Sequence, residues 1–160
     1  MCIVRFTSDL HFRHINMAVN YRHFSDVYAQ DEYIISQWNK VVKRRDLTYI
    51  LGDVTMEKKD HYYLLDQLNG HKIVVLGNHD LPQHTEELLK YVDKVAGCID
   101  YKGCVLTHIP ISETELIHHR KNIHGHIHNA RIDNDKYVNV CVDLHDYTPK
   151  TLEELGVGSK

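Results

Sequence analysis

The stretch of sequence that decides the fold is LNGHKIVVLGNHD, residues 68–80. Asn69-Gly70 is typical of a helix end, and the apolar run at 73–76 predicts a buried strand. That strand stops at Gly77 and is followed directly by three polar residues. A tight turn needs the glycine and is helped by the asparagine, but it has no need of a histidine with a carboxylate beside it. The end of this strand is therefore either an unusual turn or part of a functional site.

The composition is that of an ordinary globular protein. The chain has 160 residues, of which 42% are hydrophobic and 26% charged, and its formal net charge is −3. This length predicts one domain, residues 1–160, with room for a sizeable core. The negative charge argues against an extended nucleic-acid-binding surface but leaves a local basic groove open. The N-terminus MCIVRF lacks the features of a signal peptide and no apolar run reaches membrane-spanning length, so we expect a cytoplasmic protein without a membrane partner.

Histidine and cysteine are the informative residue types. The chain has 14 histidines but only three phenylalanines, and imidazole is the commonest metal ligand in proteins. The four cysteines are scattered and form no CxxC pair, so we interpret them as small buried hydrophobic residues in a reducing compartment. A disulfide between Cys98 and Cys104 across a hairpin is the minor alternative.

The expected elements fall into two halves. In the first half, Ser25-Asp26 can cap a helix, and a second amphipathic helix is expected around 59–68. The strands expected there are 2–7, 47–51 and 73–76, in the alternating order that is typical of parallel βαβ units. In the second half a hairpin of 92–101 and 104–108 is expected, followed by strands at 122–127 and 137–142. This pattern predicts two packed sheets with helices outside.

Each expected strand ends in residues that can bind a metal ion. Side chains alternate along extended chain, so D-x-H and H-x-H segments each place two ligands on the same side. Oxygen and imidazole ligands without a thiolate suit manganese, iron, nickel, cobalt or zinc, and we take manganese as the first choice. Seven candidates are too many for one tetrahedral zinc and suit two divalent ions that share a bridging carboxylate. The candidates are Asp9, His11, Asp53, Asn78, His108, His126 and His128.

Taken in order, these blocks resemble a known family. The chain carries Asp9-x-His11, Gly52-Asp53, Gly77-Asn78-His79-Asp80, His108 and Gly125-His126-x-His128, which are similar to the five sequence blocks of calcineurin-like metallophosphoesterases. The stretches TSDLHFRHINM, QWNKVV, LNGHKIVVLGNHD and VNVCVDLHDYTP further resemble the small single-domain bacterial and phage members. The resemblance covers nearly the whole chain. It implies a four-layer αββα sandwich of the α+β or α/β class, with two mixed β-sheets flanked by helices.

The resemblance also implies roles for the site residues. One ion would be held by Asp9, His11, Asp53 and His128, and the other by Asp53, Asn78, His108 and His126, with Asp53 bridging. His79 would face the substrate phosphate and assist the leaving group. Asp80 would hydrogen-bond the far nitrogen of His79 and fix its tautomer.

The implied activity is that of a dinuclear metal-dependent phosphodiesterase acting on small phosphodiesters, such as cyclic or short nucleotides, by attack of a metal-bridging hydroxide. The alternatives are a phosphomonoesterase with the same site and a non-catalytic metal-binding scaffold of the same fold. Arg13 and His14 follow the first block and are candidate substrate-binding residues, although related small members often have glycine where Arg13 stands. The sequence assigns no role to the tail stretch 139–148 or to His145, and it leaves the physiological substrate, the native metal and the oligomeric state open.

Overall fold

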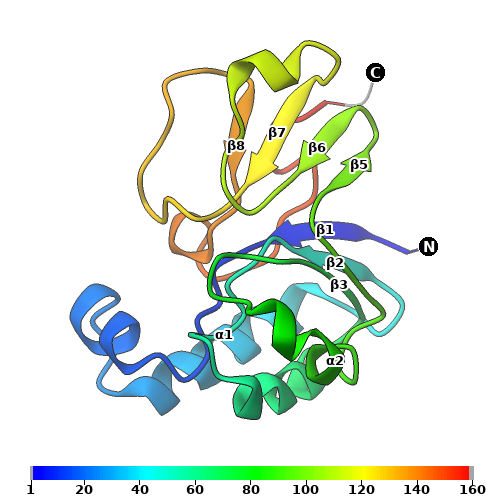
Figure 1. The fold of residues 1–160 in the computed structure, drawn as a ribbon. Coiled ribbons are helices and arrows are strands. Elements are labelled where there is room, and N and C mark those ends of the chain that lie inside the picture. The colour runs from blue at the N-terminus through cyan, green and yellow to red at the C-terminus, as the bar shows by residue number, and fades with distance from the viewer. Residues whose placement is uncertain (1, 159–160) are drawn as a thin grey trace.

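A computed structural model describes residues 2–158 of the chain. It contains two four-stranded sheets that pack face to face, with strand orders β1-β2-β3-β4 and β5-β6-β7-β8 (Figure 1). The strands of the first sheet, parallel throughout, are β1 (Val4–Thr7), β2 (Leu47–Ile50), β3 (His71–Val75) and β4 (Lys94–Ala96). Those of the second are β5 (Ile99–Tyr101), β6 (Cys104–Leu106), β7 (Lys121–His124) and β8 (Tyr137–Asn139), and only the β5–β6 pair is antiparallel. The two-sheet architecture expected from the sequence is confirmed.

Few helices flank the sheets, and most of them lie below the first sheet in Figure 1. The predicted N-cap of α1 is present, because the Asp26 side chain accepts a hydrogen bond from the backbone N–H of Ala29 at 2.8 Å. The second expected helix forms as a 3₁₀ helix, η2. The helical elements are η1 (Met17–Tyr21, a π-helix), α1 (Val27–Val41), α2 (Thr85–Leu88) and the 3₁₀ helices η2 (Lys59–Gln67), η3 (Pro82–His84), η4 (Glu113–Leu116) and η5 (Val142–Leu144).

Alternation along the strands produces two hydrophobic cores. In β2, Ile50 packs toward the helices together with Trp38 of α1, while its neighbours in sequence, Tyr49 and Leu51, face the second sheet. The core between the sheets is completed by buried residues of the second sheet such as Leu106 and others along β6 and β7. Both faces of the first sheet are covered, and its strands therefore also bury polar side chains such as Thr48 and Lys72.

The expected hairpin at 92–101 and 104–108 is only partly correct. The segment 92–101 is not one strand: it pairs with the first sheet as β4, breaks at Gly97-Cys98, and enters the second sheet as β5. The cysteine expectation needs correction in part, because Cys2 and Cys98 are exposed rather than buried. All four cysteines are free thiols, so the alternative Cys98–Cys104 disulfide is not formed. A local pattern of apolar residues cannot show that a chain changes sheets, since Val95 of β4 and Ile99 of β5 are both partly buried apolar residues although they pack in different cores.

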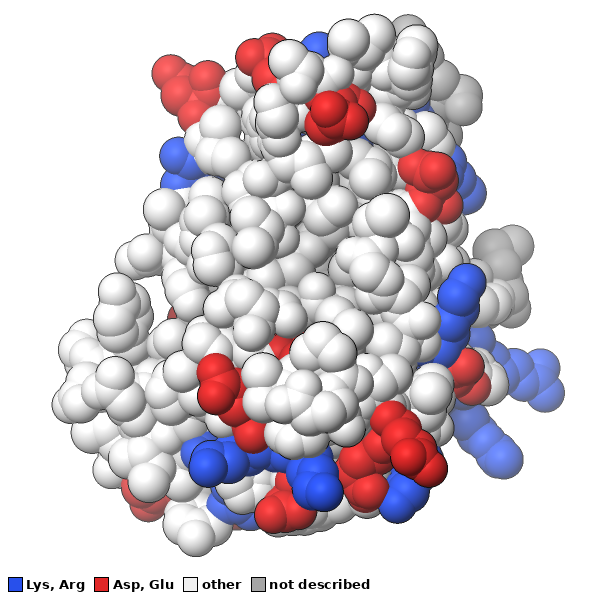
Figure 2. Space-filling view, viewed as in Figure 1, with Lys and Arg blue, Asp and Glu red and all other residues white. Residues whose placement is uncertain are grey.

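The surface carries mixed charge. On the face in Figure 2, a large uncharged area is bordered by Lys and Arg side chains that are interspersed with Asp and Glu. Within residues 2–158, no helix has both the length and the apolar character needed to cross a membrane.

Candidate metal centre

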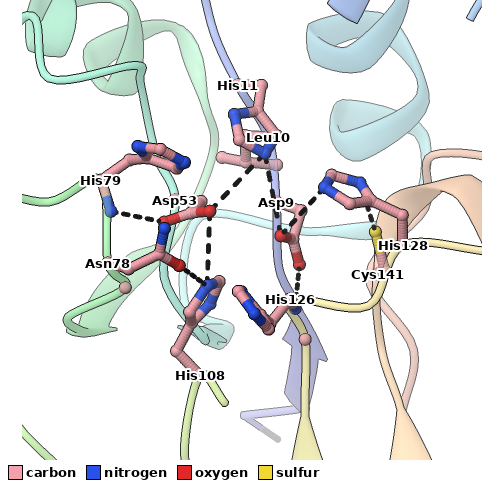
Figure 3. Close-up of polar contacts among 12 residues, drawn as sticks. Asp9, Leu10, His11, Asp53, Asn78, His79, His108, His126, His128 and Cys141 are labelled. Atoms are coloured by element: carbon pink, nitrogen blue, oxygen red, sulfur yellow. Dashed lines mark hydrogen bonds and ion pairs between the residues drawn. The ribbon is translucent and has the colours of Figure 1, made fainter. Parts of the chain in front are cut away.

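The candidate ligands come together where strands of the two sheets end. β1, β2 and β3 are parallel, so the loops that follow them leave the first sheet at the same edge. The loops after β6 and β7 of the second sheet approach this edge from the other side. Figure 3 shows the side chains of these loops pointing toward one another.

The first cluster consists of Asp9, His11 and His128, which each offer a ligand atom within 4.8 Å of the others. His11 Nε2 lies 3.8 Å from Asp9 Oδ1 and 3.7 Å from Asp53 Oδ2, and His128 Nε2 lies 4.0 Å from Asp9 Oδ1. The rings of His11 and His128 are stacked with their centroids 5.3 Å apart. These separations leave a gap between nitrogen and oxygen atoms rather than hydrogen bonds.

The second cluster consists of Asp53, His108 and His126. His108 Nε2 lies 3.3 Å from Asp53 Oδ2 and 3.0 Å from Asn78 Oδ1 (Figure 3). The other ring nitrogen, Nδ1, lies 2.7 Å from the carbonyl oxygen of Leu51 and donates its proton there. The Leu51 carbonyl therefore fixes the ring so that Nε2 faces the cluster.

Asp53 lies between the two clusters. Its Oδ2 is the atom that faces both His11 and His108, while its Oδ1 accepts a hydrogen bond from the backbone N–H of His79 at 3.0 Å. The structure thus brings all seven candidate ligands into one arrangement, with the shared carboxylate at its centre.

The residues present fit divalent metal ions. Asp9 Oδ1 and both ring nitrogens of His11 are buried without a hydrogen-bond partner, a costly state for polar atoms. A cation between Asp9 and His11 would satisfy an oxygen and a nitrogen at once. The donor set of carboxylate, amide and imidazole groups is the one that borderline divalent ions prefer.

The charges of the site are strongly coupled. Burial opposes ionisation of Asp9, but the neighbouring His11 and His108 imidazoles outweigh it and lower the pKa of Asp9 to about 2. Burial likewise disfavours the charged form of His108, yet the adjacent Asp53 carboxylate raises the pKa of His108 to about 8. At neutral pH the carboxylates are therefore ionised and, without metal, His108 is largely protonated.

Metal binding should consequently release a proton. The pKa of His108 lies near 8, and Nε2 must lose its proton before it can bind an ion, so affinity should rise with pH up to about 8. Below that value one bound proton changes the affinity about tenfold per pH unit. Calorimetric titration of Mn²⁺ at pH 7 in buffers of different ionisation enthalpy measures the protons released. A titration with no proton release would show that His108 does not exchange a proton for the ion.

The backbone of the site is unusual. Five of the seven candidate ligands have positive φ, a region that costs side-chain-bearing residues on the order of 1 kcal/mol each. Such residues persist where the surrounding structure over-determines them, and they cluster at functional sites. They are Asp9 (59°), His11 (50°), Asp53 (54°), His126 (70°) and His128 (48°). Asp9-x-His11 and His126-x-His128 are therefore not extended segments, contrary to the expectation from alternation.

Two motif glycines leave room for the carboxylates. A Cβ at Gly77 would collide with the Asp53 side chain, and a Cβ at Gly125 would collide with Asp9 and Ser8. Both glycines are needed for close approach of backbone to a candidate ligand rather than for a turn alone.

We expect Gly77→Ala to weaken metal binding by about 10–100-fold, as for other changes that displace a metal ligand. The added methyl group must push Asp53 away from the point where His11 and His108 converge. Gly97→Ala is the matched control, because a Cβ at Gly97 meets no atom within 4 Å. Calorimetric titration of both variants with Mn²⁺ provides the comparison, and equal affinities for the two would contradict this account of Gly77.

His79 and Asp80 do not form the expected pair. His79 Nδ1 lies 3.2 Å from Glu57 Oε1, which takes the position expected for Asp80. Asp80 instead accepts three backbone N–H bonds, from Asp53 at 2.7 Å, Gly77 at 2.9 Å and Val54 at 3.1 Å. Burial, reinforced by the charge of Asp53, raises the pKa of Asp80 to about 6. Asp80 thus holds together the two loops that carry Asp53 and His79, whereas Glu57 contacts the histidine; no sequence signal pointed to Glu57.

The two candidate substrate residues lie in different surroundings. The Arg13 guanidinium pairs with Asp31 (Nε to Oδ2, 3.3 Å), donates to the Tyr63 hydroxyl at 3.1 Å and lies 4.3 Å over the Tyr28 ring. His14 is closer to the clusters, with its ring centroid 5.4 Å from that of His11. Its Nδ1 is buried without a partner.

Comparisons with known proteins agree with this fold. A family model for calcineurin-like phosphoesterases matches residues 4–154. The sequence is 34% identical over 160 positions to an uncharacterized protein of Methanocaldococcus jannaschii, covering 91% of this chain and 85% of that protein. The fold is similar to that of a protein of unknown function from Aquifex aeolicus (TM-score 0.75, 27% identity, 98% of both chains). It is also similar to a protein described as a novel archaeal phosphodiesterase (TM-score 0.54, 18% identity, 86% of this chain and 81% of that one).

The fold is that of a metallophosphoesterase, and the chain carries candidate metal-ligand groups. The chain belongs to the calcineurin-like phosphoesterase family. The family is metal-dependent and acts on phosphate esters, as the sequence blocks imply.

Proposed function

We propose that this protein is a dinuclear metal-dependent phosphodiesterase that hydrolyses small phosphodiesters. The observation that carries the proposal is the pair of ligand clusters that meet at Asp53 Oδ2. Two bound ions would polarise the phosphoryl oxygens and activate water for in-line attack. The proposed metal is manganese. We further propose that residues 1–160 form a single domain and that the protein is cytoplasmic.

In this proposal His79 donates a proton to the leaving group. Its ring lies beside the first cluster, with its centroid 6.1 Å from that of His11, and is partly exposed, so it can reach a bound ester. The Glu57 carboxylate at Nδ1 orients the ring and keeps a proton on that nitrogen, which leaves Nε2 to exchange a proton with the ester oxygen.

Nucleotides are the proposed substrate class. Tyr21, at the end of η1, is 64% exposed, and its ring centroid lies 6.3 Å from that of His128. A nucleobase attached to a phosphate at the metal centre could stack on this ring. The structural neighbour described as an archaeal phosphodiesterase is consistent with a diester substrate.

A substrate panel tests the proposal. The purified protein with added Mn²⁺ is assayed on bis-p-nitrophenyl phosphate, p-nitrophenyl phosphate, and 2′,3′- and 3′,5′-cyclic nucleotides. We expect turnover of the diesters to exceed that of the monoester, and Tyr21→Ala to raise KM for the nucleotides. A preference for the monoester would indicate a phosphomonoesterase, whereas inactivity on every substrate with metal bound would indicate a scaffold; either result overturns the proposal.

A further inference from the structure

Arg22 is a buried guanidinium that follows η1 directly, with 1% of its side chain exposed. Its Nε and Nη2 donate to the two carboxylate oxygens of Asp143, at 2.8 and 3.0 Å. Nη2 also donates to the carbonyl of Asp9 at 2.7 Å, and Nη1 donates to the carbonyl of Leu10 and to Gln30 Oε1, both at 3.0 Å. Every N–H group of this side chain therefore has an acceptor, in the fixed fork geometry that only arginine offers.

The carbonyls that Arg22 holds belong to the strained loop at 9–11. Gln30, which accepts from Arg22, donates through Nε2 to the carbonyl of His11 at 3.1 Å. The carbonyls of all three loop residues are thus tied to two buried side chains. Since Asp9 and His11 have positive φ, these bonds keep their side chains turned toward the first cluster.

Asp143 connects the same arginine to the opposite side of that cluster. It lies in η5, within the tail stretch 139–148 to which the sequence assigns no role. Its Oδ2 lies 3.4 Å from His128 Nδ1 and accepts a hydrogen bond from the Cys141 thiol at 3.0 Å. A carboxylate at Nδ1 favours the tautomer protonated there, which leaves the lone pair on Nε2, the nitrogen that faces Asp9.

We propose that Arg22 and Asp143 are positioning residues for the first cluster of Asp9, His11 and His128. The pair joins a loop near the start of the chain to a histidine near its end, so that both present their ligand atoms to one ion. The second cluster does not use this pair, because the Leu51 carbonyl orients His108. The inference rests on the proposed two-metal site but concerns binding of one ion, and hydrolysis is not needed to test it.

The test is calorimetric titration of metal-free Asp143→Asn with Mn²⁺. We expect one of two binding events to weaken about 10–100-fold, as when the group that orients a metal-ligating histidine is removed. The other event should change less than about threefold. The weakened event should be the one that His128→Ala abolishes and His108→Ala retains, and adding Asp143→Asn to His128→Ala should cause no further loss at that site.

A matched control is available in β1, the strand that precedes Asp9. Arg5 of β1 is a second buried arginine in an ion pair, with Nη1 3.1 Å from Glu154 Oε2; 11% of the arginine side chain and 47% of the glutamate side chain are exposed. Glu154→Gln should lower Tm without changing either Mn²⁺ affinity. If Asp143→Asn behaves in the same way, or weakens both ions equally while folded, the pair is merely structural and the proposal is overturned.

Two further measurements keep the test decisive. Arg22→Lys retains the positive charge but loses the forked guanidinium, so it should weaken the same one of the two Mn²⁺ binding events. If Asp143→Asn does not fold, selective weakening of that event in Arg22→Lys supports the proposal, and equal weakening of both events or of neither overturns it. The side-chain ¹⁵N spectrum of His128 in zinc-loaded protein should show protonation at Nδ1 in the parent and mixed tautomers in Asp143→Asn, because an amide can donate or accept. If the parent protein binds no ions, the proposed function itself is overturned. If the parent and the variant bind both ions with equal affinity, only the positioning role of Arg22 and Asp143 is overturned.

Discussion

His79→Ala should retain both metal ions and lose about 10²–10⁴-fold in turnover of a phosphodiester, the usual value of a general acid. The imidazole is outside both ligand clusters, and its Nδ1 contacts Glu57 rather than a ligand. Removing it therefore takes away a proton donor and leaves the ligands in place. The measurement pairs Mn²⁺ stoichiometry with kcat on bis-p-nitrophenyl phosphate. Parent-like turnover would contradict the assignment of His79.

The matched control for His79 is His71, at the start of the strand that precedes the His79 loop. His71 begins β3 and forms a similar exposed pair, with Nδ1 3.3 Å from Asp93 Oδ1. His71→Ala should leave both kcat and metal content unchanged. Because each histidine has a carboxylate near its Nδ1, a difference between the variants reports position relative to the metal centre.

Asp53→Asn should weaken binding of both ions by more than about 100-fold, beyond the loss caused by removing a supporting group. Asp53 Oδ2 faces His11 of one cluster and His108 of the other. An amide of the same size removes the negative charge that both ions would share. Titration with Mn²⁺ and loss of turnover report the effect, and loss of only one ion would show that Asp53 does not bridge.

Asp46→Asn controls for the burial of Asp53. Asp46 is also a buried carboxylate, located just before β2, and it accepts backbone N–H bonds from Ile3 at 3.0 Å and Lys43 at 2.8 Å. Its amide variant should be less stable, since charge-assisted bonds to backbone are weakened. Its Mn²⁺ affinity should equal that of the parent.

The sequence predicted that the candidate ligands lie close together, because their meeting point depends on the order and direction of the strands. A strand–helix–strand order implies parallel strands, and parallel strands end at one edge. The expected side-chain directions were wrong in detail: Asp9 and His11 reach the cluster through left-handed backbone, not through alternation along a strand. Positive φ at non-glycine residues depends on tertiary contacts, and no local pattern indicates it.

The contacts that the sequence could not predict are those between distant segments. Arg22 and Asp143 are 121 positions apart, and nothing in either neighbourhood indicates the partner. The tail stretch 139–148 resembles the small members of the family, but that resemblance assigned it no role. Glu57 is a similar case, because Asp80 follows His79 directly and was the obvious partner from sequence. The three hydrogen bonds that Asp80 accepts from backbone N–H groups form only when the loops after β2 and β3 are folded side by side, so the sequence does not indicate them.

The central claim is that two ions bind on either side of Asp53. Anomalous diffraction from crystals of the Mn²⁺-loaded protein, collected at the manganese edge, tests it most directly. The account predicts two peaks roughly 3.5–4 Å apart, one beside Asp9, His11 and His128 and the other beside Asn78, His108 and His126, with Asp53 between them. A single peak, or two peaks that do not share Asp53, would contradict it.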